Sequence, residues 1–137
     1  MGKLSQQTVL ITGASAGIGE ACAVAFADAG CHLQLVARRK ERLDARVADL
    51  LARGAASVEC FQLDVRSFDA VDSVLGPLTQ RERGIDVLIN NAGLSRGLAP
   101  LHEGHLPDWE EMIDTNIKGL LYVNRVVVPS MVQRGQG

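Results

Sequence analysis

Short apolar runs alternate with longer amphipathic segments along the whole chain. The apolar runs are rich in aliphatic and β-branched side chains, which is typical of buried strands. The amphipathic segments repeat their apolar side chains at helical spacing. The pattern predicts strands at residues 8–12, 32–37, 57–63 and 86–89, and helices at 18–29, at 40–53, from 67 to about 83, and from 108 onward.

This alternation of strand and helix predicts the fold class. Strands that alternate with helices form a parallel sheet with helices on both faces. Because such crossovers are right-handed, the expected product is an α/β fold with a doubly wound sheet. The length of 137 residues fits one domain, and we see no internal repeat or low-complexity segment.

Glycines and capping residues mark several of the expected helix ends. Gly30 and Gly54 follow the first two helices and are natural C-caps. Ser67 can cap the third helix. Asp108 is expected to begin the last helix, with Glu111 as its capping-box partner.

Asn116 is a polar residue on the apolar stripe of the last expected helix. A buried amide must satisfy its hydrogen bonds, so Asn116 either holds a neighbouring backbone segment or orders a water at an active site. The residues alone favour the first alternative. The stripe that we expect to face inward consists of Met112, Ile113, Ile117, Leu120 and Val127.

Composition excludes several partner classes. The formal net charge is -2, so we expect no general attraction to nucleic acid or to an anionic membrane. No apolar run approaches the length that spans a bilayer, and the polar first residues do not look like a signal peptide. We therefore expect a cytoplasmic protein.

The cysteines do not indicate a metal site. Cys22, Cys31 and Cys60 are odd in number and widely spaced, and no C-x-x-C pair occurs. They are interpreted as small buried hydrophobic residues. We therefore expect neither a disulfide framework nor a metal ligand set.

A glycine-rich turn joins the first expected strand to the first expected helix. Gly13 permits the tight turn, Gly17 lets a ligand's pyrophosphate approach the backbone, and Gly19 lets the helix pack closely on the strand. The free N–H groups of the helix N-terminus can then bind phosphate. The alternative is a plain strand-to-helix turn whose glycines serve packing alone.

The end of the second strand favours NADP over NAD. An NAD site places a carboxylate here, to bind the ribose 2′-hydroxyl. This strand is followed instead by Arg38 and Arg39, whose guanidinium groups suit a 2′-phosphate. The alternative is that both arginines merely begin a solvated helix.

Polar residues also follow the third and fourth strands. Asp64 can accept a hydrogen bond from an adenine amino group, or can be a simple turn residue, and spacing does not separate the two. Asn90 and Asn91 precede small residues. Their amides can tie neighbouring strand ends together beside a cofactor, although a simple turn also explains them.

Taken together, these motifs resemble the short-chain dehydrogenase/reductase family over the whole chain. The motifs are "TGASAGIG" at 12–19, "LDV" at 63–65, "NNAG" at 90–93 and "DTNIKG" at 114–119. Within the family, "ARRKERL", "NNAGLSRGLAP" and "DWEEMIDTNIKGLLYVNR" look most like the NADP-dependent 3-hydroxy acid dehydrogenases. The resemblance implies a Rossmann-like sheet, truncated to about four strands in the order 3-2-1-4.

The resemblance also implies residue roles. It makes Asn116 the catalytic asparagine, which holds a water in a proton relay. It implies NADP as cofactor, a small hydroxy acid or its carbonyl as substrate, and a homo-oligomer, dimer or tetramer. The implied cofactor-binding residues are Gly13, Ser15, Gly17, Ile18 and Gly19 at the pyrophosphate, Arg38 and Arg39 at the 2′-phosphate, Asp64 and Val65 at adenine, and Asn91, Ala92 and Gly93 at the nicotinamide ribose.

The chain departs from the family pattern in one respect. The family's catalytic serine and Tyr-x-x-x-Lys motif follow a fifth strand, and we expect residues 1–137 to be the N-terminal dinucleotide-binding portion of a single Rossmann domain. Tyr122 is the only tyrosine, and Val126 stands where the lysine would be. The sequence therefore predicts an NADP-dependent oxidoreductase as a fragment, inactive alone. The alternatives are a non-catalytic NADP(H)-binding module and a decayed reading frame.

Overall fold

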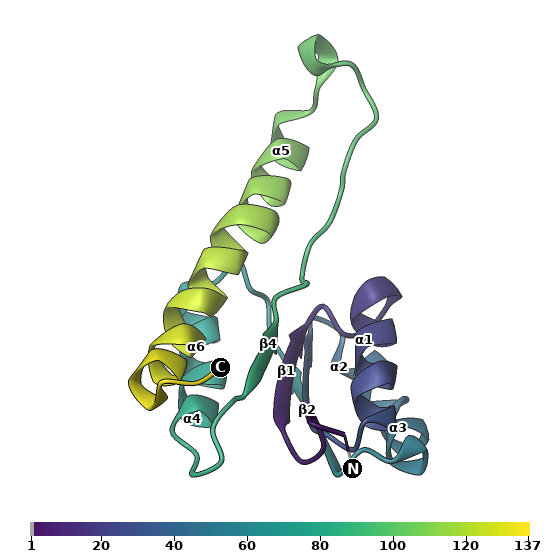
Figure 1. The fold of residues 1–137 in the computed structure, drawn as a ribbon. Coiled ribbons are helices and arrows are strands. Elements are labelled where there is room, and N and C mark those ends of the chain that lie inside the picture. Colours follow the sequence, from purple (N-terminus) through teal and green to yellow (C-terminus); the bar gives the residue numbers. More distant parts are fainter. Residues whose placement is uncertain (1) are drawn as a thin grey trace.

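The computed structural model describes residues 2–137, which form a parallel sheet with helices on both faces (Figure 1). The four strands are β1 (Thr8–Thr12), β2 (His32–Ala37), β3 (Ser57–Gln62) and β4 (Val87–Ile89). They lie in the order β3-β2-β1-β4, and every pair is parallel. The predicted strand order 3-2-1-4 and the doubly wound α/β class are confirmed.

The helices divide between the two faces. In Figure 1, α1, α2 and α3 lie on one side of the sheet, and α4 and α6 lie on the other. The bounds are α1 (Gly17–Asp28), α2 (Lys40–Asp44), α3 (Val47–Arg53), α4 (Phe68–Thr79), α5 (Leu106–Ile113) and α6 (Leu120–Arg134).

Side-chain alternation along the central strands produces two cores. Strands β1 and β2 are covered on both faces, and β1 is buried at all five positions. Because successive residues of a strand point to opposite faces, Val9 and Ile11 pack with α1, α2 and α3, whereas Leu10 packs with α4 and α6. Both cores thus hold β1 and β2 rigidly, and with them the turns at their carboxyl ends.

Two expected helices are shorter than the sequence pattern predicted. The expected helix at 40–53 is wrong as one element, because α2 ends at Asp44 and α3 begins at Val47. Helix α4 ends at Thr79, two residues after Pro77, rather than near residue 83. Ser67 caps α4 as expected, since its hydroxyl accepts a hydrogen bond from Ala70 N at 3.2 Å.

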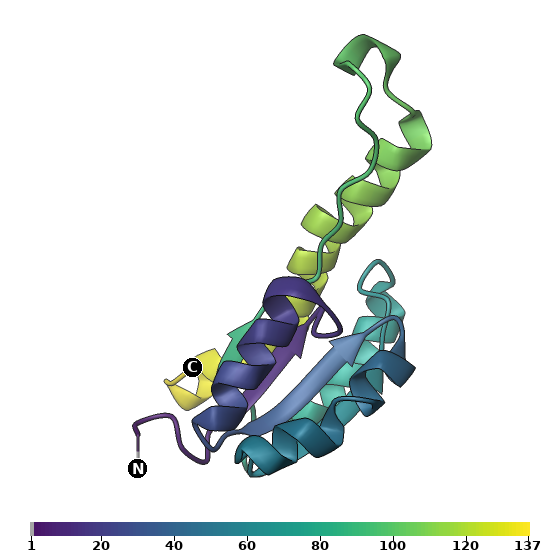
Figure 2. The ribbon, with the colours of Figure 1, turned by 90° about the vertical axis from the view of Figure 1, so that its right-hand side faces the viewer.

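Helix α5, a π-helical turn and α6 follow one another as one long rod, whose α6 end packs on the body and whose α5 end forms an arm that projects from it (Figures 1 and 2). The expected capping box is wrong, because α5 begins at Leu106 and Asp108 lies in its first turn. Asp108 pairs instead with Nδ1 of His105 at 3.4 Å. Glu111 points toward a group of arginines, described below.

The expected inward stripe is only partly right. Val127 is fully buried, whereas Ile113 and Ile117 are about half exposed and Leu120 is also exposed. The π-helical turn Asp114–Gly119 lies between these positions. It adds a residue to the turn and so rotates the face that follows.

Cys31 is fully buried, as expected, and Cys22 and Cys60 are only partly buried against the same core. Burial raises the pKa of the Cys60 thiol to about 11.

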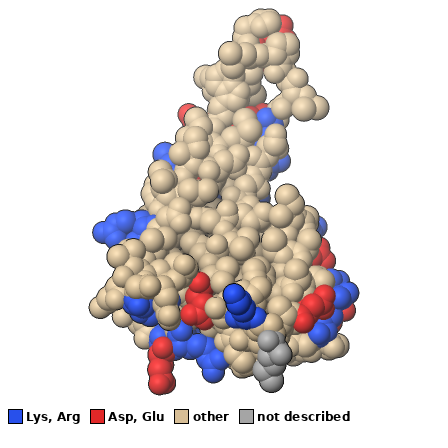
Figure 3. Space-filling model, viewed as in Figure 1, with Lys and Arg blue, Asp and Glu red and all other residues tan. Residues whose placement is uncertain are grey.

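None of the described helices is both long and apolar enough to cross a membrane. Figure 3 shows charged side chains gathered around the body, with few on the face of the arm turned to the viewer.

Candidate functional site

A cavity of about 330 Å³ opens at the carboxyl ends of the strands. In open parallel sheets, ligands bind at this edge, where the strand order reverses. Its volume lies in the range of small-molecule pockets. The residues that line it are Gly13, Ser15, Ala16, Ile18, Val36, Ala37, Arg38, Arg39, Leu63, Asp64, Val65, Asn91, Ala92, Gly93, Leu94 and Thr115.

The glycine turn owes its shape to the absence of side chains. Gly13 and Gly17 have φ angles of +63° and +58°, in the left-handed region that favours glycine. A Cβ at Gly19 would lie 2.2 Å from the carbonyl oxygen of Gly13. A Cβ at Gly17 would meet nothing within 4 Å, so its backbone is open to a ligand. The predicted tight turn at Gly13 and close packing at Gly19 agree with this geometry, and the approach of a pyrophosphate at Gly17 stays a prediction.

The N-terminus of α1 is left available beside this turn. Ala16 is the N-cap residue and provides no side-chain hydrogen bond. The first backbone bond of the helix runs from Glu20 N to Ala16 O, at 3.3 Å. The preceding N–H groups at Ile18 and Gly19 therefore remain free to bind an anion.

Asn91 ties the ends of β1 and β4 together. Its Nδ2 donates to the carbonyl oxygens of Thr12 and Gly13, both at 3.2 Å. In return, Thr12 Oγ1 accepts hydrogen bonds from Asn91 N and Ala92 N, both at 3.0 Å. This agrees with the expectation that an amide links neighbouring strand ends and leaves small residues at the cavity wall.

Arg38 and Arg39 both line the cavity at the end of β2. Arg38 is 52% exposed and lies 3.9 Å from Glu111, measured from Nη1 to Oε1. Arg39 is exposed, and its side chain makes no hydrogen bond or ion pair with any residue in 2–137, although its backbone oxygen accepts a hydrogen bond from Arg42 N. An unpaired guanidinium at a cavity rim is a ready site for a phosphate group.

Asp64 also lines the cavity but is already paired. Its Oδ2 accepts a hydrogen bond from Arg66 Nη2 at 2.7 Å, and Oδ1 accepts from the Arg66 backbone N at 3.0 Å. The Arg66 side chain, with help from that backbone N–H, lowers the pKa of the Asp64 carboxyl against the opposing effect of burial. Contact of Asp64 and Val65 with adenine stays a prediction.

Asn116 lies in the π-helical turn and does not line the cavity. Its Oδ1 accepts from Leu94 N at 2.8 Å, and its Nδ2 donates to Leu94 O at 2.7 Å. The amide thus holds a backbone segment through one donated and one accepted hydrogen bond, the first of the two alternatives given above. The expectation that Asn116 is buried is wrong, because the structure shows the residue exposed. Its implied role in a proton relay stays a prediction.

Most of the predicted cofactor residues meet around one cavity, and some of its lining was not predicted. Gly17 and Gly19 shape the turn without lining the cavity. Sequence reasoning missed Thr115, which is 8% exposed and whose Oγ1 is buried without a hydrogen-bond partner among the described residues. Its position next to Asn116 was the available signal.

Comparison with known proteins gives the same family for nearly the whole chain. The family profile "short chain dehydrogenase" matches residues 7–137. A curated relative, the NADP-dependent 3-hydroxy acid dehydrogenase YdfG of Salmonella typhi, is 46% identical over 129 residues, which is 94% of this chain and 50% of the relative. Sulfoacetaldehyde reductase 2 of Chromohalobacter salexigens is also 46% identical over 129 residues, with the same coverage of 94% and 50%.

A solved structure agrees in fold as well as in sequence. The closed form of serine dehydrogenase complexed with NADP+ superposes with a TM-score of 0.86 at 42% identity, covering 96% of this chain and 51% of that one. The chain spans about half the length of the curated relatives it matches.

Proposed function

This chain belongs to the short-chain dehydrogenase family, and from that premise we propose that the protein is an NADP-dependent oxidoreductase. It would interconvert a small 3-hydroxy acid or alcohol and the corresponding carbonyl compound. Relatives named for 3-hydroxy acids and for NADP support both parts of the proposal. We further propose that residues 1–137 are the dinucleotide-binding portion of one Rossmann domain.

The lining residues support this proposal, because they offer backbone, guanidinium and amide groups of the kinds that bind a dinucleotide. The glycine turn and the N-terminus of α1 would hold the pyrophosphate, and Arg38 and Arg39 would hold the 2′-phosphate. Asp64 and Val65 would lie at the adenine, and Asn91 to Gly93 at the nicotinamide ribose. When bound, the cofactor supplies a hydride donor or acceptor.

One observation carries the choice of NADP. The end of β2 provides two guanidinium groups to the cavity wall, and Arg39 has no partner in the described chain. The residues of β2 itself, "HLQLVA", include no carboxylate that would repel a 2′-phosphate. A free positive charge at this rim favours the phosphorylated dinucleotide.

A second candidate function is NADP(H) binding without turnover by these 137 residues alone. Tyr122 is the only tyrosine, and its ring is partly buried beside the core and packs edge-on against the exposed Phe68, with 5.5 Å between the ring centroids. It does not line the cavity. This placement supports the proposal that residues 1–137 contain the cofactor site but no acid for the carbonyl oxygen.

We also propose a homo-oligomer. A shallow apolar groove runs along the outer face of α6, and it is lined by Leu121, Asn124, Arg125, Val128, Pro129, Val132 and Gln133. A contiguous apolar surface of this kind is typical of a protein interface.

Calorimetric titration with NADP and NAD tests the proposed function. We expect NADP to bind at least about tenfold more tightly, a difference that one or two charge-assisted hydrogen bonds can supply. Equal or tighter binding of NAD, or binding of neither, would refute it. The second candidate predicts that the 137-residue chain binds NADP yet does not oxidise NADPH in the presence of a 3-oxo acid.

A further inference from the structure

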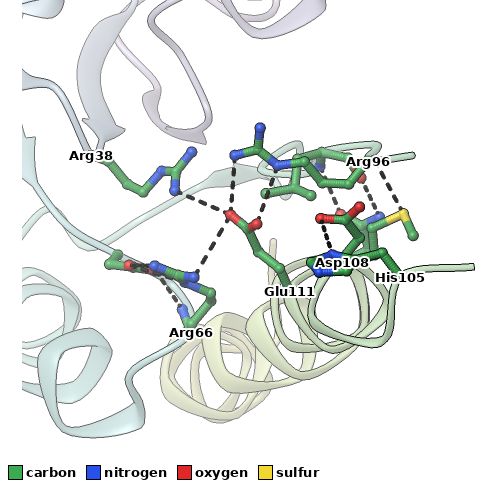
Figure 4. Close-up of polar contacts among 10 residues, drawn as sticks. Arg38, Arg66, Arg96, His105, Asp108 and Glu111 are labelled. Atoms are coloured by element: carbon green, nitrogen blue, oxygen red, sulfur yellow. Dashed lines mark hydrogen bonds and ion pairs between the residues drawn. The ribbon is translucent and has the colours of Figure 1, made fainter. Parts of the chain in front are cut away.

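Three arginines from three separate segments converge on Glu111 of α5 (Figure 4). Arg38 follows β2, Arg66 follows β3, and Arg96 lies in the segment between β4 and α5. Arg96 is the closest, with Nε at 3.2 Å from Oε2 and Nη2 at 3.3 Å from Oε1. Arg66 and Arg38 lie farther away, with Nη1 atoms at 3.8 Å and 3.9 Å from Oε1.

The three guanidinium groups differ in how closely each is already paired with a carboxylate. Arg96 makes a two-pronged pair with Glu111. Arg66 makes its two-pronged pair with Asp64 instead, through Nε and Nη2. Arg38 has only the 3.9 Å contact with Glu111 and is half exposed, so it is the guanidinium that can most readily turn toward a ligand.

Glu111 and Arg96 do not themselves line the cavity at the carboxyl ends of the strands. Arg38 does line that cavity. The Glu111 carboxylate is nevertheless close enough to compete with a phosphate for Arg38 and to repel that phosphate. Arg96, paired in a fork with the same carboxylate, offsets that negative charge.

We propose that Glu111 and Arg96 are a positioning pair that sets the preference for NADP over NAD. They act through Arg38, and neither touches the cofactor. Glu111 holds Arg38 at the rim before binding, and Arg96 weakens that hold enough for a 2′-phosphate to displace it. The inference rests on the proposed function, because it requires a 2′-phosphate at Arg38 and Arg39.

Three variants of the purified protein test the pair: Arg96→Gln, Glu111→Gln and the double variant. Arg96→Gln removes the strongest partner of Glu111, so we expect the Kd for NADP to rise about fivefold and the Kd for NAD to change less than about twofold. Glu111→Gln frees Arg38, so the Kd for NADP falls about threefold. Because Arg96 acts through Glu111, the double variant should resemble Glu111→Gln, with the Kd for NADP about threefold below wild type.

Arg53→Gln is the matched charge control. Arg53 pairs with Asp49 and Asp28 on exposed surface, and none of the three lines the cavity. The Arg53→Gln variant removes the same charge as Arg96→Gln and should leave the ratio of the Kd values for NADP and NAD unchanged. At high salt the effects of Arg96→Gln and Glu111→Gln should shrink, since exposed charges are screened.

The outcomes separate this inference from the proposed function. If wild type prefers NADP and Arg96→Gln weakens both cofactors equally, the pair only holds its segment in place and the inference is wrong. Unchanged NADP binding in Glu111→Gln also overturns it, even if Arg96→Gln fails to fold. If wild type prefers NAD or binds neither cofactor, the proposed function itself is refuted, and the inference with it.

Discussion

The glycine turn after β1 and the arginine rim after β2 border the same cavity, yet different parts of the chain shape them. The turn is made of backbone: a Cβ at Gly19 would lie 2.2 Å from Gly13 O. The rim is made of long side chains, such as Arg38, which is 52% exposed and 3.9 Å from its nearest counter-charge. Steric exclusion fixes the first region, and weak, screened charge pairs hold the second.

This difference separates two properties of one site. Under the proposed function, the turn would determine whether a pyrophosphate can approach the backbone, and its conformation admits no side chain at Gly19. The rim would determine which dinucleotide is preferred, because its guanidinium groups can turn toward a phosphate. Changes in the turn should therefore alter folding stability and the binding of both cofactors. Changes in the rim should alter selectivity and leave stability nearly unchanged.

The largest expected effect comes from Gly19→Ala. The added Cβ meets backbone, which cannot yield as a flexible side chain would. We expect the free energy of unfolding to fall by about 3 kcal/mol, measured by urea denaturation, because overpacking of this kind forces the backbone to move. NADP and NAD should both bind more weakly.

Gly17→Ala is the matched control for that prediction. Its Cβ would lie in open space, but its φ is +58°, so the cost should be about 1 kcal/mol from backbone conformation alone. Equal losses in the two variants would show that backbone conformation, rather than the contact with Gly13 O, makes glycine necessary.

A somewhat smaller effect is expected from Thr12→Val, which removes the hydroxyl that joins the turn to β4. Thr12 is fully buried, and its Oγ1 accepts hydrogen bonds from Asn91 N and Ala92 N. Valine leaves the Ala92 N–H without an acceptor, so unfolding should become easier by about 2 kcal/mol. Thr12→Ser keeps the hydroxyl and should cost less, about 1 kcal/mol, for the lost methyl group. A larger loss in the serine variant would contradict this account.

The sequence predicted the turn well because its determinants are local. Both β1 and β2 have the expected bounds, since each is a continuous run that is buried on both faces. The glycines stand at fixed spacing between a strand and a helix, and the positive φ angles of Gly13 and Gly17 follow from that arrangement.

The rim was predicted only in part, because its contacts join distant segments. Arg38 and Arg39 were recognised from their place after β2, but Glu111 was taken for a capping residue. Its three arginine partners come from separate parts of the chain. No local pattern indicates such a convergence.

Two further errors have the same origin. No glycine or proline marks the break between α2 and α3, where Arg46 reaches Glu20 of α1 at 3.1 Å. Helical spacing placed Ile113 and Ile117 inward, but the π-helical turn changes the face that the helix presents. In both cases the tertiary arrangement determines the outcome.

At the rim, Arg39→Gln should change selectivity far more than stability. Arg39 has no partner in the described chain, so its loss should change the free energy of unfolding by less than about 0.5 kcal/mol. NADP binding should weaken about tenfold, which corresponds to about 1.4 kcal/mol, while NAD binding stays unchanged. Titration of both cofactors at low and high salt checks this, and an equal loss for NAD would place Arg39 elsewhere in the site.

The smallest expected effect concerns the pH dependence of the Asp64–Arg66 pair. Arg66 lowers the pKa of Asp64 below the ordinary 3.8, so the folded state favours the charged carboxylate. The pair's contribution is therefore present above the ordinary pKa and is lost as pH falls through the lowered pKa. Because both side chains are 37% exposed, we expect no more than about 0.5 kcal/mol. Urea denaturation of wild type and Asp64→Asn should differ by this amount at about pH 6 and should agree once the pH is below the lowered pKa, where the Asp64 carboxyl is protonated and uncharged. A wild-type advantage that grew as the pH fell would have the opposite sign and would show that Arg66 does not stabilise the charged form.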